Sequence, residues 1–245
     1  MRYALLSDIH SNIHALEAVL AALSSERIDV YLCLGDVVGY GAYPNECCEM
    51  VSRLRPIAVR GNHDEAAVHP GREIWFTNAA SQCIVWTRER LTPENRDFLA
   101  SLEPLRVENF FTLCHGSVPD PDFYTTTPRE AMLSFRHMTT DMAFFGHTHV
   151  AGWFQHNPES NDLPELFLAT EDSVVQVEAG KMYLINPGAV GQPRDGMSTA
   201  AFAIYDTASA SVEYRRVAYN VAAAQQGIID AGLPEFLAAR LAVGI

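Results

Sequence analysis

Side chains able to bind divalent metal ions recur in five short blocks of this sequence. They are carboxylates, imidazoles and one carboxamide, and the blocks are Asp8-Ile9-His10, Gly35-Asp36, Gly61-Asn62-His63-Asp64, His115-Gly116 and Gly146-His147-Thr148-His149. Mixed shells of imidazole nitrogen and carboxylate oxygen suit zinc, manganese and iron, whereas a thiolate-rich set would indicate a zinc finger or an iron–sulfur cluster. These residue types therefore predict binding of divalent cations without cysteine.

The segments before the first three blocks have the pattern of buried strands joined by helices. Residues 2–7 (RYALLS), 30–34 (VYLCL) and 57–60 (IAVR) are short, mostly apolar runs. Apolar residues at three- and four-residue steps predict a helix over about 12–27, and Pro44 suits the first turn of a second helix. A β-α-β-α-β order predicts parallel strands, so the three blocks should meet at the edge where open α/β sheets bind ligands.

The other two blocks follow further apolar runs, 110–114 (FFTLC) and 142–145 (MAFF). Two helices are expected within 75–102, and Thr127-Pro128-Arg129-Glu130 has the form of a capping box that begins another. The chain should end in two short helices that break near Gly232-Leu233-Pro234. Between these parts the chain should be rich in strands, expected at 150–155, 165–169, 173–178, 182–186, 199–205 and 211–218.

Composition indicates a globular protein and restricts its partners. Of 245 residues, 48% are apolar and 19% are charged, which excludes a disordered chain. No linker, repeat or low-complexity tract divides the sequence, so one domain over 1–245 is expected. The 17 basic and 30 acidic residues leave a formal net charge of −13, which repels long nucleic acids. A small phosphorylated substrate remains compatible, because bound cations reverse that field locally.

Cysteine usage and hydropathy indicate a reducing, aqueous compartment. The five cysteines show no CxxC spacing and should be reduced, buried thiols. The adjacent Cys47 and Cys48 are most simply core residues of a helix, and a vicinal disulfide is the alternative. The apolar run at residues 1–6 is too short for a signal peptide, and no segment reaches the roughly 18 apolar residues of a spanning helix. A cytoplasmic protein without membrane attachment is expected, and its oligomeric state stays open.

The five blocks, in this order across about 140 residues, resemble those of the calcineurin-like metallophosphoesterases. The loop Gly35-Asp36-Val37-Val38-Gly39-Tyr40-Gly41 and the segment Asn186-Pro187-Gly188-Ala189-Val190-Gly191-Gln192-Pro193-Arg194 are further similar to the small bacterial and archaeal phosphodiesterase branch. The resemblance covers most of the chain, and its specificity comes from the joint occurrence of the blocks. It implies an α/β fold, a four-layer αββα sandwich of two packed mixed β-sheets flanked by helices.

The resemblance also implies a ligand set for two divalent metal ions. The ligands come from all five blocks: Asp8, His10 and His149 for one metal, Asn62, His115 and His147 for the other, and Asp36 bridging both. Two cations about 3.5–4 Å apart activate a bridging water, as hydroxide, for in-line attack on phosphorus and neutralise the charge that develops there. The ligand types accept manganese, iron, zinc, cobalt or nickel, so the identity of the metals stays open.

Five further residues are placed around the metals by the same resemblance. His63 would act in catalysis without being a ligand, by protonating or polarising the leaving oxygen, and Asp64 would orient it. General-acid assistance of this kind is worth about 10²–10⁴ in rate. Near the substrate we expect Asn12, Tyr40 and Arg194, since an arginine fork suits phosphate oxygens.

Most of these features also have an ordinary structural interpretation. An aspartate after a strand can cap a helix, and His147 and His149 could be one core and one surface histidine. Gly39-Tyr40-Gly41 could be only a turn that needs a permissive backbone. Arg194 could form an ion pair with Asp195, which is the favoured interpretation of that residue. For the aspartates and histidines, the joint occurrence of the blocks favours the metal site.

The predicted function is hydrolysis of a phosphate ester, with a diester favoured over a monoester. The enzymatic alternatives are a phosphomonoesterase, a protein phosphatase and a dinucleoside polyphosphate hydrolase, which differ in how far loops cover the site. Residues 117–127 and 156–181 are where such cover would arise. A non-enzymatic alternative is a scaffold that keeps the fold without catalysis. The retention of every ligand type and of His63 argues against that scaffold.

Overall fold

Alternating side chains along the central strands explain the layers of the fold. In the computed structural model, which describes residues 1–245, Ala4 and Leu6 of strand β1 (Arg2–Leu6) belong to a core that includes helix residues. Tyr3 and Leu5 belong instead to a core formed by two sheets. Successive residues of a strand point to opposite faces, so a strand covered on both sides is apolar throughout. β1 is therefore a central strand, with helices on one face and a second sheet on the other.

The first sheet is mixed, with the strand order β3-β2-β1-β11-β12-β9. β1, β2 and β3 are parallel to one another, which confirms the predicted β-α-β-α-β arrangement. β11, β12 and β9 extend the sheet through antiparallel pairs. The remaining strands of this sheet are β2 (Val30–Cys33), β3 (Ile57–Ala58), β9 (Val174–Gln176), β11 (Ala200–Asp206) and β12 (Ser211–Val217).

The second sheet is also mixed and has the order β4-β5-β6-β10-β7-β8. Its centre is parallel, because β6 pairs in parallel with both β5 and β10, and its outer strands are antiparallel. Tyr183 and Ile185 of β10 face the first sheet, while Leu184 faces a helix. The strands are β4 (Leu105–Val107), β5 (Thr112–Cys114), β6 (Met142–Phe144), β7 (Gly152–His156), β8 (Glu165–Leu168) and β10 (Met182–Asn186).

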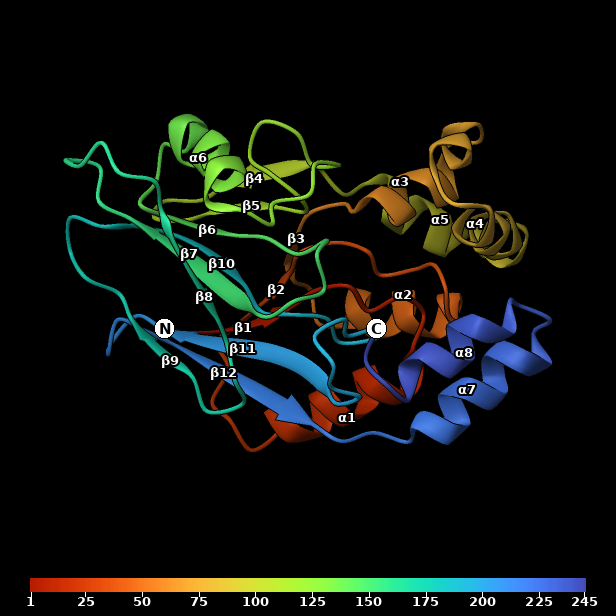
Figure 1. Ribbon diagram of the computed structural model, residues 1–245. Coiled ribbons are helices and arrows are strands. Elements are labelled where there is room, and N and C mark those ends of the chain that lie inside the picture. Colours follow the sequence, from red (N-terminus) through yellow and green to blue (C-terminus); the bar gives the residue numbers. More distant parts are fainter.

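Helices cover the outer faces of both sheets (Figure 1). α1 (Ile13–Leu23) and α2 (Pro44–Arg53) share a core with the first sheet, and α6 (Pro128–His137) shares one with the second. The order helix, sheet, sheet, helix confirms the predicted four-layer αββα sandwich. The other helices are α3 (Asn62–Val68), the 3-10 helix η1 (Arg72–Trp75), α4 (Asn78–Arg90), α5 (Pro93–Ala100), α7 (Val221–Asp230) and α8 (Glu235–Leu241).

Three elements were not predicted, and two of them are short. η1 has four residues and β4 has three, too few for a periodic pattern. The third is α3, which begins at Asn62 directly after the extended Gly61. The Gly61 N–H donates to the Asp64 carboxylate at 3.1 Å, so the third block is the first turn of a helix rather than a strand-end loop. The strand expected at 57–60 correspondingly shortens to Ile57–Ala58.

The structure also bears on the expected state of the cysteines and on whether any helix could span a membrane. All five cysteines are buried and free, so the adjacent Cys47 and Cys48 form no disulfide. Burial raises the pKa of both thiols well above the ordinary value, which keeps them protonated. No helix is both long and apolar enough to cross a membrane.

Candidate metal centre

The five blocks converge on one edge of the sandwich, in the segments that follow β1, β2, β3, β5 and β6. The convergence brings together residues that are far apart in sequence, such as His10 and His149, which are separated by 139 positions. All of the clustered side chains are buried. They form three overlapping groups whose ligand atoms lie within 4.8 Å of one another: Asp8 with His10 and His149, Asp36 with His115 and His147, and His10 with Asp36 and His63.

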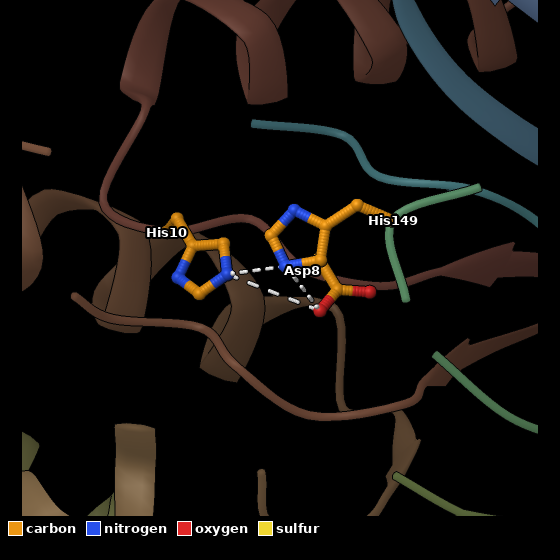
Figure 2. Close-up of side chains that lie close together, drawn as sticks. All are labelled: Asp8, His10 and His149. Atoms are coloured by element: carbon orange, nitrogen blue, oxygen red, sulfur yellow. Dashed lines mark hydrogen bonds and ion pairs between the residues drawn. The ribbon is translucent and has the colours of Figure 1, made fainter. Parts of the chain in front are cut away.

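The first group points three electron-pair donors at one place (Figure 2). The Nε2 atoms of His10 and His149 are 3.1 Å apart, and Asp8 Oδ1 lies 3.9 Å and 3.3 Å from them. The opposite nitrogen, Nδ1, lies 3.1 Å from the Val38 carbonyl in His10 and 2.6 Å from the Gln192 carbonyl in His149. Carbonyl oxygens only accept, so the hydrogens sit on Nδ1 and both Nε2 atoms carry lone pairs. Lone pairs that face each other in this way fit a cation.

The second group repeats this arrangement. The Nδ1–H of His115 donates to the Leu34 carbonyl at 2.7 Å, so its other nitrogen, Nε2, faces the centre, 3.2 Å from Asp36 Oδ2 and 3.1 Å from His147 Nδ1. Asn62 Oδ1, which is expected to bind the same metal, is buried and has no hydrogen-bond partner. Unpartnered buried polar atoms are rare in folded proteins and require an explanation, and a bound ion supplies one.

Asp36 joins the two groups. Its Oδ2 lies 3.5 Å from His10 Nε2 and 3.2 Å from His115 Nε2, so one carboxylate oxygen faces both sets of donors. Its Oδ1 accepts a hydrogen bond from the backbone N–H of His63 at 2.9 Å, which holds the carboxylate in place. A Cβ atom at Gly61 would lie only 2.1 Å from Oδ1, so this approach requires glycine.

Burial dominates the electrostatics of the cluster. It lowers the pKa of His10 and His149 well below the ordinary value, so both rings are neutral donors. It raises the pKa of Asp8 to about 6. Burial acts to lower the pKa of His115, but the charge of Asp36, the hydrogen bond to that carboxylate and the charge of Asp8 together raise that pKa to about 10. Without a cation, His115 therefore carries a proton beside Asp36, and a metal ion would take over the role of that positive charge.

Strained backbone conformations concentrate at this edge. Nine residues other than glycine have a positive φ, and seven of them belong to the segments of the site: Asp8, His10, Ser11, Asp36, Tyr40, His147 and His149, with φ between 50° and 65°. Each such residue costs on the order of 1–3 kcal/mol, and such strain clusters at functional sites. The left-handed conformation turns these side chains inward at the ends of their strands.

His63 lies at the rim of the cluster, enclosed by aromatic rings. Its ring centroid is 4.4 Å from that of Tyr40, 4.8 Å from that of His10 and 4.9 Å from that of Phe76. Its Nδ1 is buried and has no partner. Gly39, with φ of 99°, lies so close that an added Cβ would be 2.4 Å from that nitrogen. The Gly39-Tyr40-Gly41 turn thus needs its permissive backbone and also forms a wall of the His63 pocket.

Asp64 does not contact the His63 imidazole in a hydrogen bond, contrary to the expectation that it orients the ring. Its Oδ1 accepts from the Val38 N–H and its Oδ2 from the Gly61 N–H, each at 3.1 Å. Burial, reinforced by the nearby charge of Asp36, raises the pKa of this carboxyl to about 7. Asp64 therefore ties the loop that follows Asp36 to the start of α3, which carries His63.

The side-chain amide of Asn12, expected near the substrate, forms hydrogen bonds within the protein. Its Oδ1 accepts from the Ala15 N–H at 3.2 Å as the N-cap of α1, and its Nδ2 donates to the Gly191 carbonyl at 2.8 Å. Both polar atoms of the side chain thus have protein partners. Its expected contact with a substrate stays a prediction.

Arg194 points toward the cluster rather than toward its neighbour in sequence. Its guanidinium carbon lies 5.9 Å from the Tyr40 ring, its Nη2 donates to Gln192 Oε1 at 3.2 Å, and its Nε is buried without a partner. Asp195 instead pairs with Arg216. The expected ion pair between Arg194 and Asp195 is therefore wrong, because the chain turns between the two residues and directs them to different partners. The substrate-binding role of Tyr40 and Arg194 stays a prediction.

A cavity of about 340 Å³ opens beside Asn62, His63 and His147. Its other walls come from η1, the start of α4 and the 117–127 loop, and no residue of 156–181 lines it. Tyr124 of that loop lies over His147 with ring centroids 3.8 Å apart, so the first of the two expected covering segments does reach the site. Sequence reasoning singled out none of the other eight wall residues: Glu65, Arg72, Trp75, Phe76, Thr77, Ala80, Asp122 and Tyr124. The position of Tyr124 and Asp122 in the 117–127 loop was the one available signal.

Comparisons with known proteins agree with this geometry. Residues 1–210 match the calcineurin-like phosphoesterase superfamily domain. An uncharacterized protein of Methanocaldococcus jannaschii is 36% identical over 246 residues, which cover 98% of this chain and 97% of that protein. The crystal structure of a metallophosphoesterase from Sphaerobacter thermophilus covers 100% of both chains with 38% identity and a TM-score of 0.90. A hypothetical protein from Pyrococcus horikoshii OT3 shares the fold, with 21% identity, a TM-score of 0.78 and coverage of 100% and 98%.

The chain belongs to the calcineurin-like phosphoesterase superfamily, as its sequence blocks predicted. It is a phosphoesterase, and its buried histidine and aspartate side chains are consistent with a metal site. The roles expected for the individual residues remain predictions.

Proposed function

We propose that the protein hydrolyses a small phosphodiester with the help of two divalent cations. One cation would be held by Asp8, His10 and His149, and the other by Asn62, His115 and His147, with Asp36 shared. The observation that carries this proposal is the facing of donor lone pairs in the first group, where no proton is available between His10 Nε2 and His149 Nε2. Two cations there would activate a water molecule for in-line attack and neutralise developing charge on the phosphoryl oxygens.

His63 is proposed to act on the leaving oxygen as a hydrogen-bond donor. Burial, opposed in part by Asp36, lowers the pKa of this imidazole to about 4. At neutral pH the ring is therefore neutral and polarises the oxygen through one N–H, instead of delivering a proton from an imidazolium. Arg194, with a buried Nε that lacks a partner, is proposed to hold a phosphoryl oxygen.

Three features support a diester over a monoester. A phosphodiester carries one negative charge at neutral pH and a monoester nearly two, so the net charge of −13 opposes approach of the diester less strongly. The cavity of about 340 Å³ next to His63 also provides room for a substituent on the leaving side. The similarity of the Gly35–Gly41 and Asn186–Arg194 segments to the phosphodiesterase branch points the same way.

The walls of the site support a small substrate rather than a phosphorylated protein. Tyr124 covers His147, and Phe76 packs edge-on against His63 with ring centroids 4.9 Å apart. Together they confine the approach to a cavity with the volume of a small-molecule site. The net charge of −13 likewise disfavours long nucleic acids as substrates.

Hydrolysis of bis(4-nitrophenyl) phosphate with added Mn²⁺ tests the proposal. We expect turnover by the metal-loaded protein, none after chelation, and recovery when Mn²⁺ is restored. His63→Ala should lower kcat by about 10²–10⁴ while the metal content, measured by elemental analysis, stays unchanged, because the imidazole is not a ligand.

His137→Ala is the matched control, since that imidazole is exposed on α6 and belongs to none of the clusters. It should retain the full rate. Equal rates for the metal-loaded, chelated and His63→Ala proteins would leave only the scaffold interpretation. Faster hydrolysis of the monoester 4-nitrophenyl phosphate than of the diester would overturn the assignment of substrate class.

A further inference from the structure

Aromatic rings line the cavity from the metal centre to its mouth. Tyr40, Phe76 and Tyr124 each pack against an imidazole, with ring centroids 4.4 Å, 4.9 Å and 3.8 Å from their partners. Trp75 lines the same cavity but packs against no other ring, and 80% of it is exposed. A large apolar side chain exposed at the mouth of a site, next to rings that are already engaged, is a free stacking surface.

The position of Trp75 places this surface on the leaving-group side. It is the last residue of η1, directly before Phe76, whose ring touches the His63 imidazole. Asn62 and His63 line the same cavity, so a group bound against Trp75 would extend from the phosphorus past His63. The position therefore suits recognition of the group that departs.

The charged residues that line the cavity are Glu65, Arg72 and Asp122. Glu65 pairs with both Arg60 and Arg72, which neutralises its carboxylate. The Arg72 side chain is 55% exposed, and its Nη2 is 3.5 Å from Glu65, so the guanidinium also faces the solvent at the mouth. An aromatic face combined with an arginine is the combination that binds single nucleotides by stacking and charge.

We propose that the cavity binds a leaving group that contains a planar aromatic ring, as a nucleoside does, and that this ring stacks on Trp75. The inference rests on the proposed function, because it takes the reacting phosphate to lie at the metal centre. The volume of about 340 Å³ accommodates one nucleoside-sized group. The net charge of −13 restricts the substrate to short phosphate esters rather than polymers.

Inhibition of bis(4-nitrophenyl) phosphate hydrolysis distinguishes the contribution of the ring to binding from that of the phosphate. Adenosine 5′-phosphate should inhibit about tenfold more tightly than ribose 5-phosphate, which has the same phosphate and sugar but no base. Trp75→Ala should reduce this ratio to about one, and Trp75→Phe should retain most of it. Ile74→Ala is the matched control, because Ile74 lies on the same turn and is 72% exposed but does not line the cavity. It should leave the ratio unchanged.

Tryptophan fluorescence tests the ring contact without turnover or metal. Adenosine should quench the emission of the chelated protein, ribose should not, and Trp75→Phe should abolish the quenching. Trp86 and Trp153 serve as internal controls, since both are half-buried and lie outside the cavity. Quenching by adenosine in a protein that hydrolyses no diester would refute the proposed function and leave the aromatic site standing.

Three results would overturn the inference while leaving hydrolysis intact. One is equal inhibition by the two phosphates in the unaltered protein. Another is retention of the preference by Trp75→Ala. The third is a change of oligomeric size in both Ile74→Ala and Trp75→Ala without any preference for the nucleotide, which would make the exposed turn a protein interface.

Discussion

Backbone carbonyls decide which nitrogen of the site histidines faces the centre. His10, His115 and His149 each direct Nδ1 at a main-chain oxygen, at 3.1 Å, 2.7 Å and 2.6 Å. Their Nε2 atoms therefore point at the centre before any cation arrives, which reduces the reorganisation that binding requires. The left-handed backbone at five of the expected ligands contributes to the same orientation, at a cost in stability that the rest of the fold offsets.

From the His115 side chain we predict that the stability of the metal-free protein depends on pH. The pKa of His115 is about 10 in the folded chain against 6.5 ordinarily, so between pH 7 and 9 the folded state holds a proton that the unfolded state has lost. The free energy of unfolding should then fall as pH rises, by on the order of 1 kcal/mol per pH unit. Urea unfolding of the chelated protein at pH 7, 8 and 9 measures this.

The matched variant for that experiment is His115→Gln. It removes the main titrating group and should leave only the smaller fall that Asp64, with a pKa of about 7, contributes near pH 7 to 8. A stability of the chelated parent protein that rises over this interval would show that His115 is not protonated beside Asp36.

At the scale of elements, the segment between β10 and β11 is bound to the end of β1. The N–H groups of Val190 and Gly191 donate to the carbonyls of Ser7 and Asp8, each at 2.9 Å. Asn12 adds a side-chain link from the start of α1 to the same segment. Because this segment also carries the carbonyl that orients His149, packing of α1 bears on the geometry of the site.

The Asn12→Ala substitution should therefore lower the free energy of unfolding by more than the loss of a helix cap alone would. We expect a loss of about 2–3 kcal/mol in the free energy of unfolding, because the N-cap is lost and the Gly191 carbonyl is left buried without its partner. Asn220→Ala is the matched control, since Asn220 caps α7 through Ala223 at an exposed position without a second link. It should cost about 1 kcal/mol. Equal losses in urea unfolding would show that the link to Gly191 contributes nothing.

At the scale of the whole molecule, the electrostatic field opposes anionic substrates. The net charge of −13 acts over the Debye length, which shrinks from about 30 Å at 0.01 M salt to about 10 Å at 0.1 M. The local positive charge of bound cations acts at short range and survives this screening. Salt should therefore weaken the repulsion of the substrate by the net charge more than its attraction to the bound cations.

We accordingly expect kcat/KM for a phosphodiester to rise about two- to fivefold between 0.01 M and 0.1 M KCl at saturating metal. The change should appear in KM, with kcat nearly constant, because screening alters approach rather than the chemical step. The dianionic 4-nitrophenyl phosphate should show a steeper rise than the diester. A fall in kcat/KM with salt would indicate that positive charge around the site, rather than the net charge, governs approach.

Sequence alone was sufficient wherever a few neighbouring residues carry the information. Short, mostly apolar runs predicted β1 and its parallel partners, and Thr127 with Glu130 predicted the capping box of α6, which the structure shows. The blocks could be placed at strand ends for the same local reason. Together with the family resemblance, they predicted the fold and the class of enzyme.

Only the tertiary structure decided which distant groups meet and which atoms they present. The 3.1 Å approach of His10 to His149, the pairing of Asp195 with Arg216 and the exposure of Trp75 at the cavity that His63 also lines all depend on sheet register and loop packing. No local pattern encodes those relations, because they join segments separated by tens of residues, and their free energies arise only when the two sheets and their covering loops pack together.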